Sequence, residues 1–118
     1  MPLYLTQFAY TPEAWSALVK HPEDRSQVLG QLLEEVGGKL ICFYYAFSDY
    51  DGVFIFEAPD EVAAAGALLA VFGPGHNKAI KTTQLLTVDQ ALESMRRASQ
   101  VRYRPPTASS EAWRPYTD

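Results

Sequence analysis

The pattern of apolar and polar positions begins with a strand followed by a capped helix. Residues 3–10, LYLTQFAY, are rich in β-forming side chains and predict a first strand. Thr11 can then cap free backbone N–H groups, and Pro12 suits the first helical position. Glu13 complements the positive end of the helix dipole. We therefore predict a short helix that ends near Lys20.

A second helical segment follows the break at Pro22. Its apolar side chains recur at helical spacing and form one stripe, while the charged side chains between them face water. The paired glycines 37–38 end the segment, because glycine readily adopts the left-handed conformation found after a helix. The stripe consists of Val28, Leu29, Leu32, Leu33 and Val36.

Two further strands and a strongly apolar helix come next. Residues 39–47, KLICFYYAF, and 52–58, GVFIFEA, predict the two strands of a hairpin. Asp60 is the expected cap of the helix that contains VAAAGALLAVF, which stops at the Gly-Pro-Gly of residues 73–75. That helix is apolar nearly all round, so we expect it to be covered on more than one side.

The last regular elements are a fourth strand and a short helix. Residues 78–87, KAIKTTQLLT, predict the strand, and Thr87 with Gln90 forms a capping-box pattern for the helix. From about Ser99 the periodicity is lost and prolines accumulate. We predict one domain over residues 1–98 and an extended arm or disordered tail over residues 99–118.

This order of elements predicts an α+β fold. It matches the ferredoxin-like βαββαβ pattern, an antiparallel sheet with helices on one face, followed here by one more helix. Both faces of the predicted strands are largely apolar, which disagrees with a sheet that has one face in water. The simplest solution is a homodimer in which two sheets close face to face.

Several short stretches together resemble the GYD domain family. They are LYLTQFAYTPEA at residues 3–14, GGK at 37–39, SDYD at 48–51 and EAPD at 57–60. The resemblance covers about residues 1–95. It implies a dimeric α/β barrel, in agreement with the two apolar faces, and it does not imply a function.

The hairpin turn has two possible positions. Asp51–Gly52 suits a two-residue turn of type I′, whereas the resemblance places the turn at Ser48–Asp49, with serine where the family usually has glycine. We adopt the second position, which pairs Phe47 with Tyr50. One face then carries Ile41, Phe43, Tyr45, Phe47, Tyr50, Phe54 and Phe56, and the other carries Leu40, Cys42, Tyr44, Ala46, Asp51, Val53, Ile55 and Glu57.

Tyr44, Asp51 and His76 are the candidate catalytic residues. A carboxylate such as Asp51 in an apolar cavity can act as a general acid or base, and Tyr44 could hold an oxyanion. His76 follows a Gly-Pro-Gly stop, where loops can line the rim of a pocket. The alternative is that Asp51 pairs with backbone at a strand end and His76 is a solvated loop residue.

Composition excludes several classes of function. The net charge of −4 argues against nucleic acid as a partner. One cysteine and two separated histidines offer no metal-ligand spacing, so we predict no metal and no cofactor. We find neither a targeting segment nor an apolar run long enough for a membrane helix, and therefore expect a cytoplasmic protein with no membrane partner.

Three functional hypotheses remain open. The first is a non-catalytic homo-oligomeric module, dimeric or larger, whose barrel interior accommodates a small apolar ligand. The second is an enzyme similar in architecture to cofactor-independent monooxygenases and isomerases, acting in the barrel cavity. The third is a pure assembly role in which Trp113 and Tyr116 of the tail strap onto a neighbouring subunit.

Overall fold

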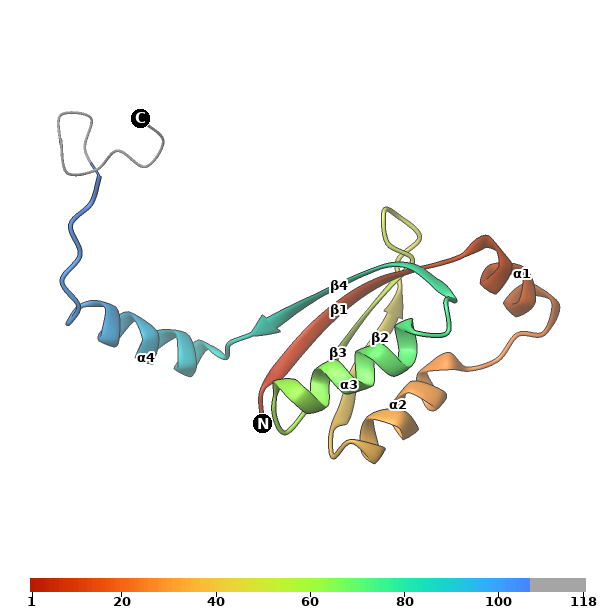
Figure 1. Ribbon diagram of the computed structural model, residues 1–118, viewed down its shortest axis with the longest axis horizontal. Helices are drawn as coiled ribbons and strands as arrows, with labels where there is room; N and C mark the ends of the chain where they lie inside the picture. The colour runs from red at the N-terminus through yellow and green to blue at the C-terminus, as the bar shows by residue number, and fades with distance from the viewer. Residues whose placement is uncertain (107–118) are drawn as a thin grey trace. The chain divides into compact units, whose positions relative to one another are not determined.

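The computed structural model describes residues 1–106 and divides into two compact units, residues 1–86 and a second unit that begins at Thr87. The first unit contains one four-stranded sheet with the order β2-β3-β1-β4, in which every neighbouring pair is antiparallel (Figure 1). The strands are β1 (Leu3–Tyr10), β2 (Lys39–Tyr45), β3 (Gly52–Glu57) and β4 (Asn77–Leu85). This confirms the predicted ferredoxin-like α+β arrangement.

Helices α1 (Pro12–Lys20), α2 (Arg25–Glu35) and α3 (Glu61–Phe72) complete the first unit, with two helices in the first connection. The predicted starts of α1 and α3 are confirmed. The Thr11 hydroxyl accepts a hydrogen bond from Ala14 N–H at 3.1 Å, and the Asp60 carboxylate accepts one from Ala63 N–H at 2.8 Å. Each cap satisfies a backbone donor that has no partner inside its own helix.

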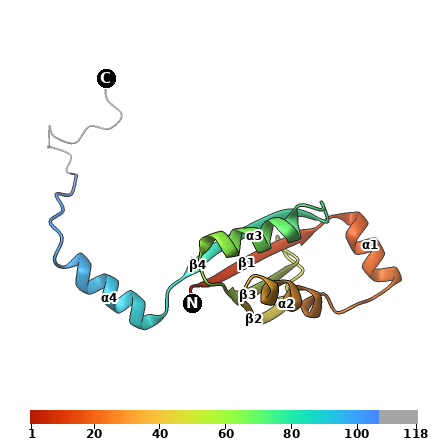
Figure 2. The ribbon, with the colours of Figure 1, turned by 60° about the horizontal axis from the view of Figure 1, so that its bottom comes forward.

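The core lies between one face of the sheet and helices α2 and α3 (Figure 2). Leu33 of α2 and Ala64 of α3 pack onto a layer of aromatic side chains from β1 and β3. Alternation along the strands places this layer on a single face, because successive side chains point to opposite sides. The buried aromatic residues are Tyr4, Phe8, Tyr10, Phe54 and Phe56.

Helix α3 leaves much of its apolar surface uncovered within the first unit. It buries Ala64 and Ala67, whereas Val62 and Leu69 are 78% and 68% exposed. The expected cover on more than one side is therefore not supplied by residues 1–86. Val62 and Leu69 therefore form an exposed apolar surface on α3.

The pairing of β2 with β3 follows the predicted register over most of its length. Tyr45 pairs with Gly52, as a pairing of Phe47 with Tyr50 would require. A β-bulge between Leu40 and Cys42 shifts the register at the start of β2. One extra residue in one strand reverses the faces of the residues before it. The placement of Ile41 on the aromatic face was therefore wrong: Leu40 pairs with Phe56 there, and Ile41 is 49% exposed.

The hairpin connection is longer than the predicted two-residue turn. It spans residues 46–51 and is held by hydrogen bonds from Ala46 N–H to Asp51 O and from Ser48 N–H to Tyr50 O. Phe47 adopts a positive φ of 55°, a backbone conformation that residues other than glycine seldom take. Phe47 and Tyr50 thus belong to the loop and not to the paired strands.

The second unit contains α4 (Val88–Ala98). The predicted capping box is confirmed, because Thr87 and Gln90 exchange hydrogen bonds between their side chains and backbone N–H groups. Glu93 forms ion pairs with Arg96 and Arg97 on the exposed surface of this helix. The predicted strapping role of Trp113 and Tyr116 lies outside the described residues.

Candidate functional site

Asp51 is a connecting residue between the hairpin loop, β1 and α1. Its Oδ2 accepts hydrogen bonds from Tyr10 N–H at 2.9 Å and from Trp15 Nε1–H at 3.0 Å. Its own N–H donates to Phe8 O at 2.8 Å. The β1–β3 ladder ends at the pair Phe8–Gly52, and Tyr10 lies two residues past this pair on β1. The Asp51 carboxylate therefore accepts the hydrogen bond of the Tyr10 N–H, which has no backbone acceptor on β3.

Aromatic rings surround this carboxylate. The Trp15 indole meets the Tyr10 ring edge-on with 5.1 Å between centroids, and it lies 5.7 Å from Phe47 and 5.9 Å from Tyr45. Such tilted and edge-on pairs match the positive edge of one ring with the negative face of another. The positive-φ conformation of Phe47 places its ring against Trp15, so the strained loop residue takes part in this cluster.

Tyr44 lies on the opposite face of the sheet. It pairs with Val53, whereas its neighbours Phe43 and Tyr45 point to the helix side, and its side chain is 66% exposed. The predicted sharing of a face by Tyr44 and Asp51 was wrong. Strand alternation stops at Gly52, and the Asp51 side chain turns to Tyr10 and Trp15 instead.

His76 lines a cavity of about 390 Å³ on the helix side of the sheet, between α1, α2 and α3. Neither Tyr44 nor Asp51 is among the residues that line it. The structure therefore does not bring Tyr44, Asp51 and His76 together at one site. Asp51 holds elements together, Tyr44 lies on the uncovered face, and His76 alone borders a space for a ligand.

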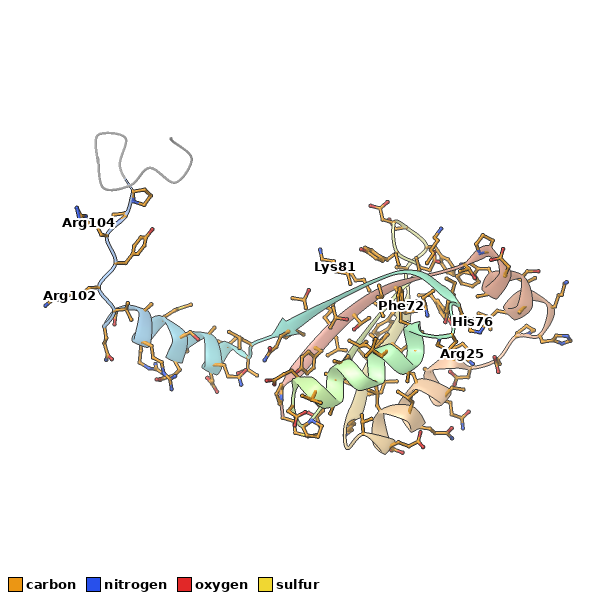
Figure 3. The ribbon with its side chains drawn as sticks, viewed as in Figure 1. Arg25, Phe72, His76, Lys81, Arg102 and Arg104 are labelled. Carbon is orange, nitrogen blue, oxygen red and sulfur yellow. The ribbon has the colours of Figure 1, made fainter. Side chains whose placement is uncertain are left out.

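The cavity has an apolar floor and a polar rim. Its floor is formed mainly by Phe8 and Phe54 of the sheet and by Leu29 of α2, all of which are buried. At the rim Arg25 Nη1 makes an exposed ion pair with Glu23 Oε1 at 3.1 Å. Figure 3 shows Arg25 and His76 at the same end of the first unit. An apolar floor with a few polar groups at its edge is the usual composition of a small-molecule site.

Tyr10 adds a neutral hydrogen-bond donor to this rim. Burial raises the pKa of its phenol, the nearby Tyr45 hydroxyl raises it further, and the Arg25 guanidinium lowers it. The pKa remains above the ordinary value of 10.0, so the hydroxyl keeps its proton at neutral pH. Tyr10 and Arg25 were not predicted from sequence, because the pattern marks Tyr10 as a strand residue and Arg25 as a solvent-facing helix residue.

The open face of the sheet is the side away from α2 and α3. Its central row runs from Cys42 through Ile55 and Leu5 to Thr83, as the strand pairings require. The first three of these side chains are half-buried in the single chain. Lys81 belongs to the neighbouring row and lies on the other side of the sheet from Arg25 and His76 (Figure 3).

Neither a metal centre nor a membrane segment is found in the described part of the chain. Within residues 1–106, no three His, Cys, Asp or Glu side chains are close enough to hold a metal ion together. The helices of this range are too short or too polar to cross a membrane.

The sequence of this chain is similar to those of known proteins. The sequence profile described as GYD domain matches residues 4–95, which confirms the resemblance seen in the sequence. A protein of Thermus thermophilus, named glutamine synthetase and cystathionine beta-lyase binding protein, is 29% identical over 91 residues. The matched region covers 77% of this chain and 93% of that protein.

A solved structure shows a likeness of fold. The crystal structure of MtbAldR matches with a TM-score of 0.53 at 10% identity, over 73% of this chain and 53% of that chain, so this chain spans about half its length. The 30S ribosomal protein S6 of Thermotoga maritima matches with a TM-score of 0.43 at 16% identity, over 85% of this chain and 98% of that chain. The likeness to MtbAldR concerns the fold alone.

Proposed function

This chain belongs to the GYD domain family, and from that premise we propose that it is a homodimeric protein-binding module without a catalytic role of its own. The observation that carries the proposal is the presence of two separate apolar surfaces on one small unit. One is the open face of the sheet around Leu5 and Ile55, and the other is the exposed side of α3 around Val62 and Leu69.

The open face is the surface that we assign to the homodimer. Leu5 and Ile55 pair directly across β1 and β3, and Cys42 extends their row onto β2. A sheet with an apolar second face is stable in water when another layer covers that face. Two copies of the same face can cover each other around a twofold axis, which is the commonest symmetry of protein oligomers.

The exposed side of α3 is the surface that we assign to a different protein. Because it lies on the helix side, a face-to-face dimer through the sheets would leave it accessible. The Thermus thermophilus relative is named for binding glutamine synthetase and cystathionine beta-lyase. We propose that this chain likewise binds a metabolic enzyme, with Leu69 near the centre of the contact.

Two matched substitutions test the open face and the exposed side of α3 independently. Ile55→Lys places a charge in the centre of the open face, and Leu69→Lys makes the same kind of change on α3. We expect sedimentation equilibrium to give about twice the chain mass for the wild type and for Leu69→Lys. Ile55→Lys should give the chain mass, with helix and strand content retained by circular dichroism. A monomeric wild type with intact secondary structure contradicts the homodimer.

The partner is tested with purified enzymes. Glutamine synthetase and cystathionine beta-lyase from the source organism of this chain are titrated with the wild type and with Leu69→Lys in a calorimeter. We expect at least one enzyme to bind, and we expect Leu69→Lys to weaken that binding about tenfold or more, because buried apolar anchors dominate interface energies. Equal binding by both proteins would exclude α3 as the docking surface, and absence of binding to either enzyme would refute the proposed partner class.

A further inference from the structure

The cavity between α1, α2 and α3 lies on the other side of the sheet from the proposed dimer surface, and Ala70 and Val71 line it on α3, whereas Val62 and Leu69 of the proposed docking surface do not. Its lining residues belong to the helix side of the first unit, whereas the homodimer is assigned to the open face of the sheet. About 390 Å³ lies within the range that small-molecule sites occupy. The sequence led us to expect an apolar ligand in the barrel interior, on the other side of the sheet.

The floor of the cavity selects for an apolar group. Phe8 and Phe54 are each 3% exposed, and Phe43 lies parallel to Phe54 with an interplanar angle of 5°. Leu29 and Leu32 of α2 form the adjoining wall. A flat aromatic ring or a branched alkyl chain placed here gains burial without leaving a polar atom unpaired.

The rim selects for a single negative charge. Arg25 carries a planar guanidinium that can bind a carboxylate through two parallel hydrogen bonds. It is half-buried, and it is close enough to the Tyr10 hydroxyl to influence the pKa of that group. The Tyr10 hydroxyl and the His76 and Asn77 side chains add possible donors around the same opening.

Glu23 limits the charge of the ligand. Its carboxylate pairs with Arg25 at 3.1 Å, so the rim as it stands has no large positive excess. A phosphate monoester, with close to two negative charges, would be attracted by one guanidinium and repelled by the Glu23 carboxylate. A monocarboxylate needs only to take the place of Glu23 at Arg25, an exchange that costs little because exposed ion pairs are weak.

We propose that this cavity binds a small monocarboxylic acid with an aromatic or branched aliphatic body. The apolar body lies on Phe8 and Phe54, and the carboxylate is bound by Arg25 with the Tyr10 hydroxyl as a second donor. Glu23 competes with the ligand for the guanidinium and so sets its affinity.

The test uses 3-phenylpropionate and its neutral amide, 3-phenylpropanamide, as probes on the full chain. Binding is followed by the amide resonances of the labelled protein up to about 10 mM probe, because ligands of this size have modest affinity. We expect the acid to shift resonances of Val28 and Leu29 on the cavity wall in a saturable way. The amide should bind about tenfold more weakly, because it offers no charge to Arg25.

Four variants locate the site. Arg25→Gln should weaken binding of the acid about tenfold and leave binding of the amide unchanged. Glu23→Gln should strengthen binding of the acid several-fold, because its competitor is removed. Ala17→Trp, an exposed position on the cavity wall, should block both probes, and Lys39→Gln at the start of β2 should change neither.

Distinct outcomes overturn the inference. They are no saturable shift with the acid, equal affinity for acid and amide, or an equal loss of affinity in Arg25→Gln and Lys39→Gln. If Arg25→Gln fails to fold, Glu23→Gln and Ala17→Trp decide the matter, since both positions are exposed. The proposed function does not depend on the result, because the dimer and the enzyme partner are measured on variants of other surfaces.

Discussion

Replacing Asp51 by alanine tests whether this residue is structural or catalytic. Its Oδ2 accepts hydrogen bonds from Tyr10 N–H and Trp15 Nε1–H, at 2.9 and 3.0 Å. Hydrogen bonds to charged groups contribute about 1.5–3 kcal/mol each to stability. The two bonds share one oxygen and are only partly buried, so their contributions do not add fully. We expect Asp51→Ala to lower the free energy of unfolding by about 2–4 kcal/mol.

The isosteric variant Asp51→Asn separates charge from geometry. Its side-chain oxygen can still accept from both donors but lacks the negative charge, so we expect a loss of about 1–2 kcal/mol. Asp49→Asn, an exposed position in the same loop, is the matched control and should change stability by less than about 0.5 kcal/mol.

Urea unfolding followed by far-ultraviolet circular dichroism measures these differences. All variants must be compared at one protein concentration, because the proposed homodimer would make the measured stability depend on concentration. If Asp51→Ala and Asp49→Asn unfold at the same urea concentration, the carboxylate does not hold the hairpin to β1 and α1. The structural assignment of Asp51 would then be wrong, and a role in binding or chemistry would have to be reconsidered.

Three further predictions concern close contacts and caps. Gly52→Ala should destabilise the protein by about 1–3 kcal/mol in urea unfolding, because a Cβ there would lie 2.3 Å from Cζ of buried Phe8; wild-type stability would contradict this. Gly66→Ala should stabilise by about 0.5–1 kcal/mol in the same assay, since nothing lies within 4 Å and alanine favours the helix; a loss would refute the open environment. Asp24 is the N-cap of α2, and its side chain accepts hydrogen bonds from the backbone N–H groups of Ser26 and Gln27. A hydrogen bond from the Ser26 side chain and then these backbone bonds hold the folded-state pKa of Asp24 below 3.8. The capping is therefore complete above pH 3.8 and is lost as the pH falls through the folded-state pKa. Asp24→Asn, which caps without titrating, should therefore lose less stability than the wild type on acidification below about pH 4, and equal losses would contradict the assignment.

The sequence alone determined the features that depend on neighbouring residues. Thr11, Asp60 and Thr87 could be recognised as caps because a cap and the N–H groups it serves lie within three residues of each other. The pairing of the two hairpin strands followed for the same reason. The apolar character of both strand faces also led to the prediction of a face-to-face dimer, which stays a prediction.

Only the tertiary structure decided which side chains meet. Trp15 and Asp51 are 36 positions apart, and no local pattern indicates that the indole donates to this carboxylate. The bulge beside Ile41 reverses the faces at the start of β2, and composition does not reveal it. Arg25 and His76 border one cavity because α2 and the start of β4 converge beside the same end of the sheet. Local hydrogen bonding and periodicity are encoded in consecutive residues, whereas a site depends on distances that exist only after the chain has packed.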